Sequence, residues 1–69
     1  EKDNRTAAEQ LLIATQRFPL HPAPHLFLGI AYEAGGQSER ARKAYRKTLL
    51  LTSQDSELQT EARVRMRKL

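Results

Sequence analysis

Apolar residues recur at three- and four-residue steps in separate segments of the chain, which is the spacing of one face of a helix. The stripe of the first segment is Ala7, Leu11, Ala14 and Phe18. The third carries Ala41, Ala44, Tyr45, Thr48 and Leu49, and the last carries Leu58, Ala62, Met66 and Leu69. No segment alternates apolar and polar residues as a half-buried strand does. The pattern predicts an all-α fold of four helices with short connections.

Capping residues and helix breakers set the expected ends of these helices. Asn4 or Thr6 is placed to cap the first helix, and Pro19 ends it. Pro22 and Pro24 suit the first turn of the second, where a missing N–H costs nothing. Gly35 and Gly36 supply its left-handed C-cap, Ser38 caps the third helix, and Ser56 with Gln59 forms a capping box before the fourth. The expected helices span residues 4–19, about 22–35, about 38–52 and 56–69.

The helices repeat at a fixed offset of 34 residues. Ala7, Leu11 and Ala14 of the first stripe correspond to Ala41, Tyr45 and Thr48 of the third. At the same offset, Leu28 and Tyr32 correspond to Ala62 and Met66. A constant period of this length is typical of architectures built from stacked helix pairs.

The period and its residues resemble the tetratricopeptide repeat (TPR) family. The family pattern W-x2-L-G-x2-Y…A-x3-F…P lies on His25, Leu28, Gly29, Tyr32, Ala41 and Tyr45. The sequence departs from it at His25, which replaces the first aromatic residue, and at Ser53, where the closing proline is expected. The resemblance implies one antiparallel helix-turn-helix domain over residues 1–69. It divides into the second helix of a preceding repeat (4–19), one complete repeat (22–55) and a capping helix (56–69).

The resemblance also implies a close helix crossing inside the repeat. Gly29 and Ala41 would let the two backbones approach, while Leu28, Tyr32 and Tyr45 fill the space beside them. In the fourth helix Arg63 stands where Gly29 stands in the second, so a further helix could not come as near. This favours the fourth helix as the C-terminal cap of the stack.

Members of this family bind proteins in a concave groove, and the resemblance assigns groove positions here. They are Ala23, Leu26, Ile30, Glu33 and Ala34 on the second helix and Thr60, Val64, Arg67 and Lys68 on the fourth. Leu26 and Ile30 stand where chaperone-binding members carry a Lys and an Asn that clamp a carboxylate. The implied ligand is a protein segment, a peptide or a helix, that is apolar with an acidic flank. The alternative is that Leu26 and Ile30 pack against another domain, in a scaffold or self-association element.

Charge is unevenly distributed along the chain, whose net charge is +4. Residues 1–37 carry three basic and four acidic side chains, whereas residues 38–69 carry nine basic and four acidic ones. Arg42 with Arg46, and Lys43 with Lys47, are four residues apart and so share helix faces. No aromatic residue alternates with these cations to stack on bases, so nucleic acid is not the favoured partner. The simpler interpretation is a solvated helix face.

No catalytic set or cofactor motif stands out, so we expect a protein that is not an enzyme and has no cofactor. The chain has no cysteine and no Gly-rich phosphate loop. His21 and His25 are four residues apart, but prolines separate them and no acidic third ligand is near, so packing or capping roles are favoured over a metal site. No apolar run reaches membrane-span length, which favours a cytoplasmic protein. Because the first residue is Glu1, we expect a piece of a longer chain or a processed protein.

Overall fold

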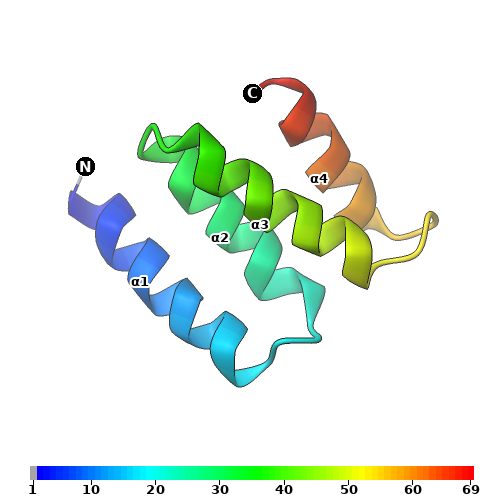
Figure 1. Cartoon of the computed structure of the whole chain (residues 1–69), viewed down its shortest axis with the longest axis horizontal. Helices are drawn as coiled ribbons and strands as arrows, with labels where there is room; N and C mark the ends of the chain where they lie inside the picture. Colours follow the sequence, from blue (N-terminus) through cyan, green and yellow to red (C-terminus); the bar gives the residue numbers. More distant parts are fainter. Residues whose placement is uncertain (1) are drawn as a thin grey trace.

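The computed structural model describes residues 2–69, with side chains from Thr6 onward. It contains α1 (Lys2–Arg17), α2 (Pro22–Ala34), α3 (Ser38–Leu51) and α4 (Glu57–Arg67), and no strand in the described part (Figure 1). The prediction of an all-α fold with four helices and short connections is confirmed. The helix ends agree with the expected ones to within two residues, which is the usual uncertainty of a helix boundary.

Successive helices run in opposite directions, and α2 is the element that joins the others (Figure 1). α2 packs against α1, α3 and α4, and α3 also packs against α4. In the described part of the chain the backbone of α1 approaches neither α3 nor α4, although Ala8 of α1 and Ala44 of α3 belong to one core cluster with Leu28 and Ala31 of α2. α1 and α3 therefore lie on either side of α2, and their backbones are separated by a gap that α2 underlies.

The turn between α2 and α3 is a Schellman motif. The N–H of Gln37 donates to the carbonyl of Tyr32 and the N–H of Gly36 donates to that of Glu33, over 2.9 Å and 3.0 Å. Gly36 has a φ of +80°, the left-handed conformation that glycine adopts without steric cost. The predicted left-handed C-cap is confirmed at Gly36.

The predicted N-caps are right at one helix and wrong at two. The Ser56 hydroxyl accepts a hydrogen bond from the backbone N–H of Leu58 over 3.1 Å, as an N-cap should. α1 begins at Lys2, so Asn4 and Thr6 lie inside the helix rather than before it. Ser38 is the first residue of α3, and the capping position belongs to Gln37, which makes no side-chain cap.

Gln59 does not complete the predicted capping box, because its side chain turns the other way. Its amide nitrogen donates to the Leu49 carbonyl, the Thr52 carbonyl and the Thr52 hydroxyl over 3.3, 3.1 and 3.2 Å. Its amide oxygen accepts a hydrogen bond from Arg63 over 3.0 Å. Gln59 thus binds carbonyl groups in the last turn of α3, and it fixes α4 to that end.

The inward faces of α3 and α4 are as predicted, and that of α1 is only partly so, because Leu11 of its predicted stripe packs against a core cluster. Ala41, Tyr45 and Ala62 are fully buried in one core cluster, against which Leu49, Leu58, Met66 and Leu69 pack. In α1, Ala8 and Thr15 are buried, whereas Ala7 and Phe18 of the predicted stripe are exposed. The buried face of α1 therefore runs through Ala8, Leu11 and Thr15 rather than through Ala7 and Phe18.

Gly29 lies at a close approach of α2 to α3, but its neighbour is not the one predicted. A Cβ added at Gly29 would lie 2.5 Å from Cε1 and 2.7 Å from Cδ1 of Tyr45. The sequence suggested that Gly29 makes room for the backbone near Ala41. The structure shows that it makes room for the aromatic ring of Tyr45, which is fully buried.

Candidate functional site

The predicted groove loses its central residue to the core. Only 2% of the Leu26 surface is exposed, and Leu26 packs in the cluster of Ala41, Tyr45 and Ala62. The assignment of Leu26 to a partner-binding surface is therefore wrong. Ile30, one turn further along α2, is half-buried and packs against the same cluster. The interpretation from sequence gave the outward position to Leu26, whereas the structure buries Leu26 and exposes its neighbour Phe27.

Glu33 is engaged inside the molecule rather than offered to a ligand. Its carboxylate accepts a hydrogen bond of 2.6 Å from the Tyr45 hydroxyl, which links α2 to α3. Burial raises the pKa of Tyr45 above its usual value, the Glu33 carboxylate raises it further, and the Arg65 guanidinium of α4 acts in the opposite direction. Arg65 also pairs with Glu61 over 2.7 Å. These polar groups tie three helices together, so Glu33 has a structural role.

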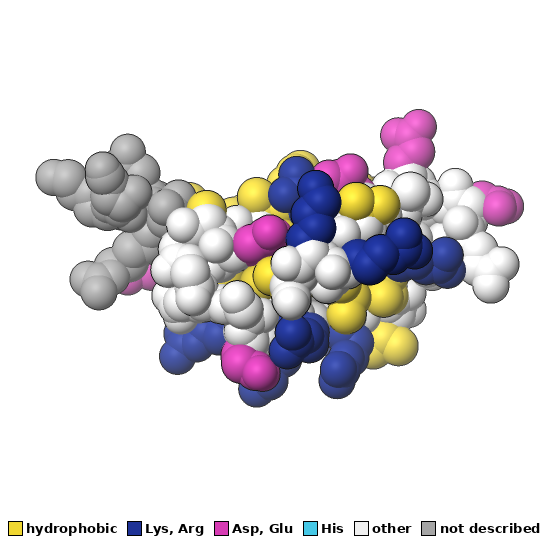
Figure 2. All heavy atoms as spheres, turned by 90° about the horizontal axis from the view of Figure 1, so that it is seen from above, with side chains coloured by type: hydrophobic (Ala, Val, Ile, Leu, Met, Phe, Trp, Pro, Cys, Tyr) yellow, Lys and Arg dark blue, Asp and Glu magenta, His cyan; other side chains and the backbone are white. Residues whose placement is uncertain are grey.

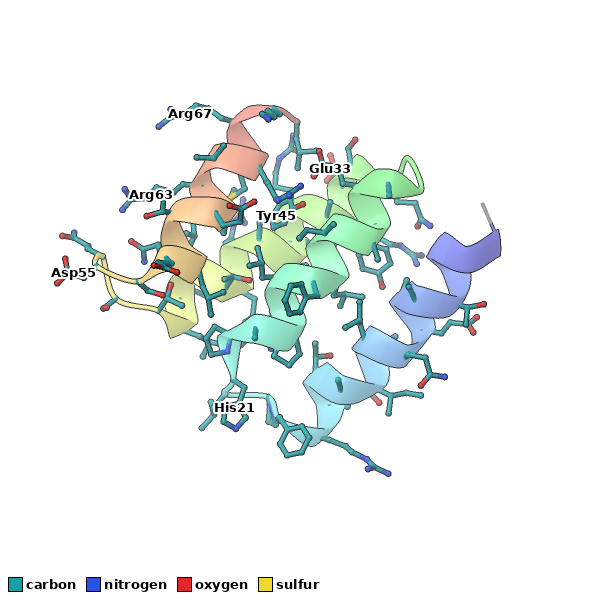
Figure 3. All side chains as sticks on the ribbon, turned by 180° about the vertical axis from the view of Figure 1, so that it is seen from behind. His21, Glu33, Tyr45, Asp55, Arg63 and Arg67 are labelled. Carbon is teal, nitrogen blue, oxygen red and sulfur yellow. The ribbon has the colours of Figure 1, made fainter. Side chains whose placement is uncertain are left out.

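The predicted basic end of the groove does not face α2. Figure 3 shows Arg63 and Arg67 projecting from α4 on the side away from α2. Arg67 is the counterpart of Glu33 at the 34-residue offset. The Glu33 side chain reaches toward α3, the helix that follows α2, so Arg67 points to the side of α4 on which a following helix would pack. Lys68 is exposed at the C-cap of α4. Arg67 is therefore corrected from a groove residue to a residue of the outer face of α4.

A partly exposed apolar row runs along α2. Phe27 is 51% exposed, although α2 packs against all three other helices. The spacing of four, three and four residues places four apolar side chains on one face, which we call the α2 row: Ala23, Phe27, Ile30 and Ala34. On α4, Val64 is 42% exposed and Thr60 is exposed. Val64 repeats Ile30 at the 34-residue offset.

Phe27 is the residue that sequence reasoning missed. It stands between Leu26 and Leu28, both of which are buried, so three consecutive apolar residues hid which one faces outward. The spacing to Ala23 and Ile30 was the available signal, because those two residues were already assigned to the groove and share a helix face with Phe27.

A second surface feature lies in the gap between α1 and α3, and we call it the α1–α3 cleft. Its volume is about 290 Å³. The lining comes from three helices: Leu12 and Thr15 on α1, His25, Leu28 and Tyr32 on α2, and Arg40, Lys43, Ala44 and Lys47 on α3. Of these residues only His25, Leu28 and Tyr32, all on α2, lie on positions of the family pattern. The sequence therefore gave no reason to group them.

The α1–α3 cleft is positively charged on one side only. Arg40, Lys43 and Lys47 come from one face of α3, and no Asp or Glu lines the cleft among the described side chains. The Arg40 guanidinium lies over the Tyr32 ring, 5.9 Å from its centroid, which favours its position by a cation–π contact. In Figure 2, several Lys and Arg side chains lie along the lower edge of the molecule, which is the side nearest the viewer in Figure 1.

The histidines take part in the connection between α1 and α2. The Nε2–H of His25 donates to the Pro19 carbonyl over 3.2 Å, which ties the first turn of α2 to the connection that follows α1. The His21 ring lies against Phe18, with 5.6 Å between ring centroids. The described residues contain no group of three His, Cys, Asp or Glu able to hold a metal ion. No helix in this part of the chain is long and apolar enough to cross a membrane.

No family model, no curated protein and no solved structure matches this chain. The resemblance to tetratricopeptide repeats thus stays a prediction from the sequence. The surfaces described above are what a functional proposal has to rest on.

Proposed function

We propose that the chain is a protein–protein interaction module that binds a peptide or helix of a partner along the α2 row. The observation that carries this proposal is the half-exposed Phe27 ring on the most enclosed helix of the fold. Aromatic side chains are enriched among the residues that dominate binding energy at interfaces. An apolar face that stays uncovered on a packed helix suits an apolar partner segment, including the apolar side of an amphipathic helix.

Two further features support the α2 row as the binding surface. Ala23 and Ala34 at its ends are small, so a partner backbone can approach α2 closely on either side of Phe27. The tetratricopeptide resemblance adds the expectation that the face formed by α2 and α4 binds proteins. Because Arg67 faces away from α2, apolar contact rather than an acidic flank is the property we propose for a ligand of this row.

The test compares proteins captured from a lysate by the parent chain and by two single variants. Phe27→Asp is expected to abolish capture of specific partners, because it places a charge in an apolar contact. Leu50→Asp is the matched control, since Leu50 is an exposed leucine on α3 and lies outside the α2 row. Quantitative mass spectrometry of the captured proteins, with the helical signal in circular dichroism as a folding check, gives the answer. Identical partner sets for parent and Phe27→Asp would remove the α2 row as the binding surface.

A second candidate function, self-association or docking within a larger chain, is favoured by the apolar surface around α1. Of the large apolar residues that stay exposed, four belong to α1 and the connection that follows it: Leu12, Ile13, Phe18 and Leu20. Sedimentation equilibrium over a range of concentrations tests whether this surface joins two copies. A dimer that dissociates on dilution, and is absent in an Ile13→Asp, Phe18→Asp variant, supports self-association, whereas a monomer at all concentrations contradicts it.

A further inference from the structure

We propose that the α1–α3 cleft is a second binding site, separate from the α2 row, and that it takes an acidic protein segment presenting one large apolar side chain. The proposal rests on the shape of the cleft, on the one-sided charge of its lining and on the kind of side chains at its floor. Each of these is independent of the residues in the α2 row.

The shape of the cleft suits a single side chain. Leu28 and Tyr32 of α2 form its floor, because the backbones of α1 and α3 lie apart on either side of them in the described chain. Its volume of about 290 Å³ lies at the lower limit of small-molecule pockets, which run from roughly 300 to 1,000 Å³. Leu12 on its wall is 41% exposed, so the cleft is open and an occupant would keep one side in solvent. A side chain carried by a longer segment fits this arrangement better than an enclosed ligand does.

The charge of the lining selects an acidic segment. Arg40, Lys43 and Lys47 are separated by three and four residues, so they extend over roughly 10 Å of α3 at a rise of about 1.5 Å per residue. The two ion pairs among the described side chains, Arg42–Glu39 and Arg65–Glu61, involve none of these three residues. Carboxylates placed along the segment would therefore meet cations that no described carboxylate neutralises. Such complementarity also orients the segment and speeds its encounter.

The apolar floor distinguishes a protein segment from a nucleic acid. A single strand bound without sequence preference needs exposed aromatic rings on which its bases stack. The only aromatic carbocycle in the lining, Tyr32, is half-buried and has the Arg40 guanidinium over it. His25 is held by its hydrogen bond to the Pro19 carbonyl. Leu12, Leu28 and Ala44 instead offer aliphatic contact, which an apolar amino-acid side chain can use.

The experiment uses the whole chain and a fluorescent peptide, blocked at both ends, in which one leucine lies between two pairs of glutamates. Fluorescence anisotropy is expected to show binding that weakens about ten-fold in a Lys43→Glu, Lys47→Glu variant. An Arg46→Glu, Arg67→Glu variant is the matched control, because it changes the net charge equally at exposed residues outside the lining. It is expected to weaken binding less than about two-fold. A Lys43→Gln, Lys47→Gln variant repeats the test if the glutamates disturb α3, which circular dichroism shows.

A second arm tests the apolar contact and the choice of occupant. Leu12→Asp, and separately a peptide whose leucine is replaced by glycine, should each remove most of the binding, while Leu50→Asp and Phe27→Asp should leave it intact. If the Phe27→Asp variant still binds the peptide, the α1–α3 cleft is a binding site separate from the proposed α2 row. Three outcomes overturn the proposal: no binding of the peptide to the parent chain, equal losses in the two charge variants, or tighter binding of a uridine oligonucleotide or of decanoate than of the peptide.

Discussion

Replacing Gly29 by alanine is expected to lower the free energy of unfolding by roughly 1–3 kcal/mol, the usual cost of overpacking a core. Helix propensity alone predicts the opposite sign, because alanine is better than glycine by about 1 kcal/mol in a helix interior. Overpacking prevails because the new Cβ would lie 2.5 Å from the Tyr45 ring. That ring is fully buried and hydrogen-bonded to Glu33, so it has no free direction in which to move.

Urea unfolding of four proteins in a double-mutant cycle measures this effect. They are the parent, Gly29→Ala, Tyr45→Leu and the double variant. In the Tyr45→Leu background the alanine should be much less harmful, because the ring that it meets is gone and the two residues are in direct contact. Equal stability of the parent and Gly29→Ala would show that the ring can shift and that the close contact does not explain the glycine.

Removing residues 56–69 is expected to leave a chain that no longer unfolds cooperatively. α4 covers the cluster of Leu26, Ala41 and Tyr45, and a small domain has little other buried surface with which to compensate. The same deletion removes the Gln59 amide from the carbonyl groups of Leu49 and Thr52. The uncovered apolar surface should also promote aggregation.

Thermal melting followed by circular dichroism, together with light scattering, tests the deletion. The full chain should show one sigmoidal transition, and the fragment of residues 1–55 a gradual loss of helical signal with increased scattering. Adding residues 56–69 back as a separate peptide should restore part of the transition if α4 acts as a cover. A fragment that stays in solution and melts cooperatively would mean that α4 is an appendage and not the cap predicted from the sequence.

Periodicity was sufficient for the fold because the apolar stripes of α3 and α4 are single and well separated from polar residues. It was insufficient for α1, where Leu11, at 34-residue spacing from Tyr45, packs against the core but Ala7, at the same spacing from Ala41, is exposed beside the buried Ala8. A period identifies the residues on one face of a helix, but it does not say which face meets a neighbour. That depends on which helices are present on each side.

The candidate sites were harder to predict because they depend on differences of one residue or on contacts between distant segments. Leu26 and Phe27 are adjacent and both apolar, yet one is almost fully buried and the other half-exposed. The α1–α3 cleft combines Leu12 with Lys43 and Lys47, which no local motif connects. Those residues come together only in the folded chain, where α1 and α3 both pack on α2 and form the two walls of the cleft.

The contacts of α1 have a consequence for how the molecule could adapt to a ligand. α2, α3 and α4 pack against one another in all pairs and form one three-helix body, whereas the backbone of α1 approaches that of α2 alone in the described chain. Widening the α1–α3 cleft by moving α3 would disturb two helix interfaces, but widening it by moving α1 disturbs one. If the proposed site in the cleft is occupied, we therefore expect α1 rather than α3 to move, and the α2 row on the three-helix body to keep its shape.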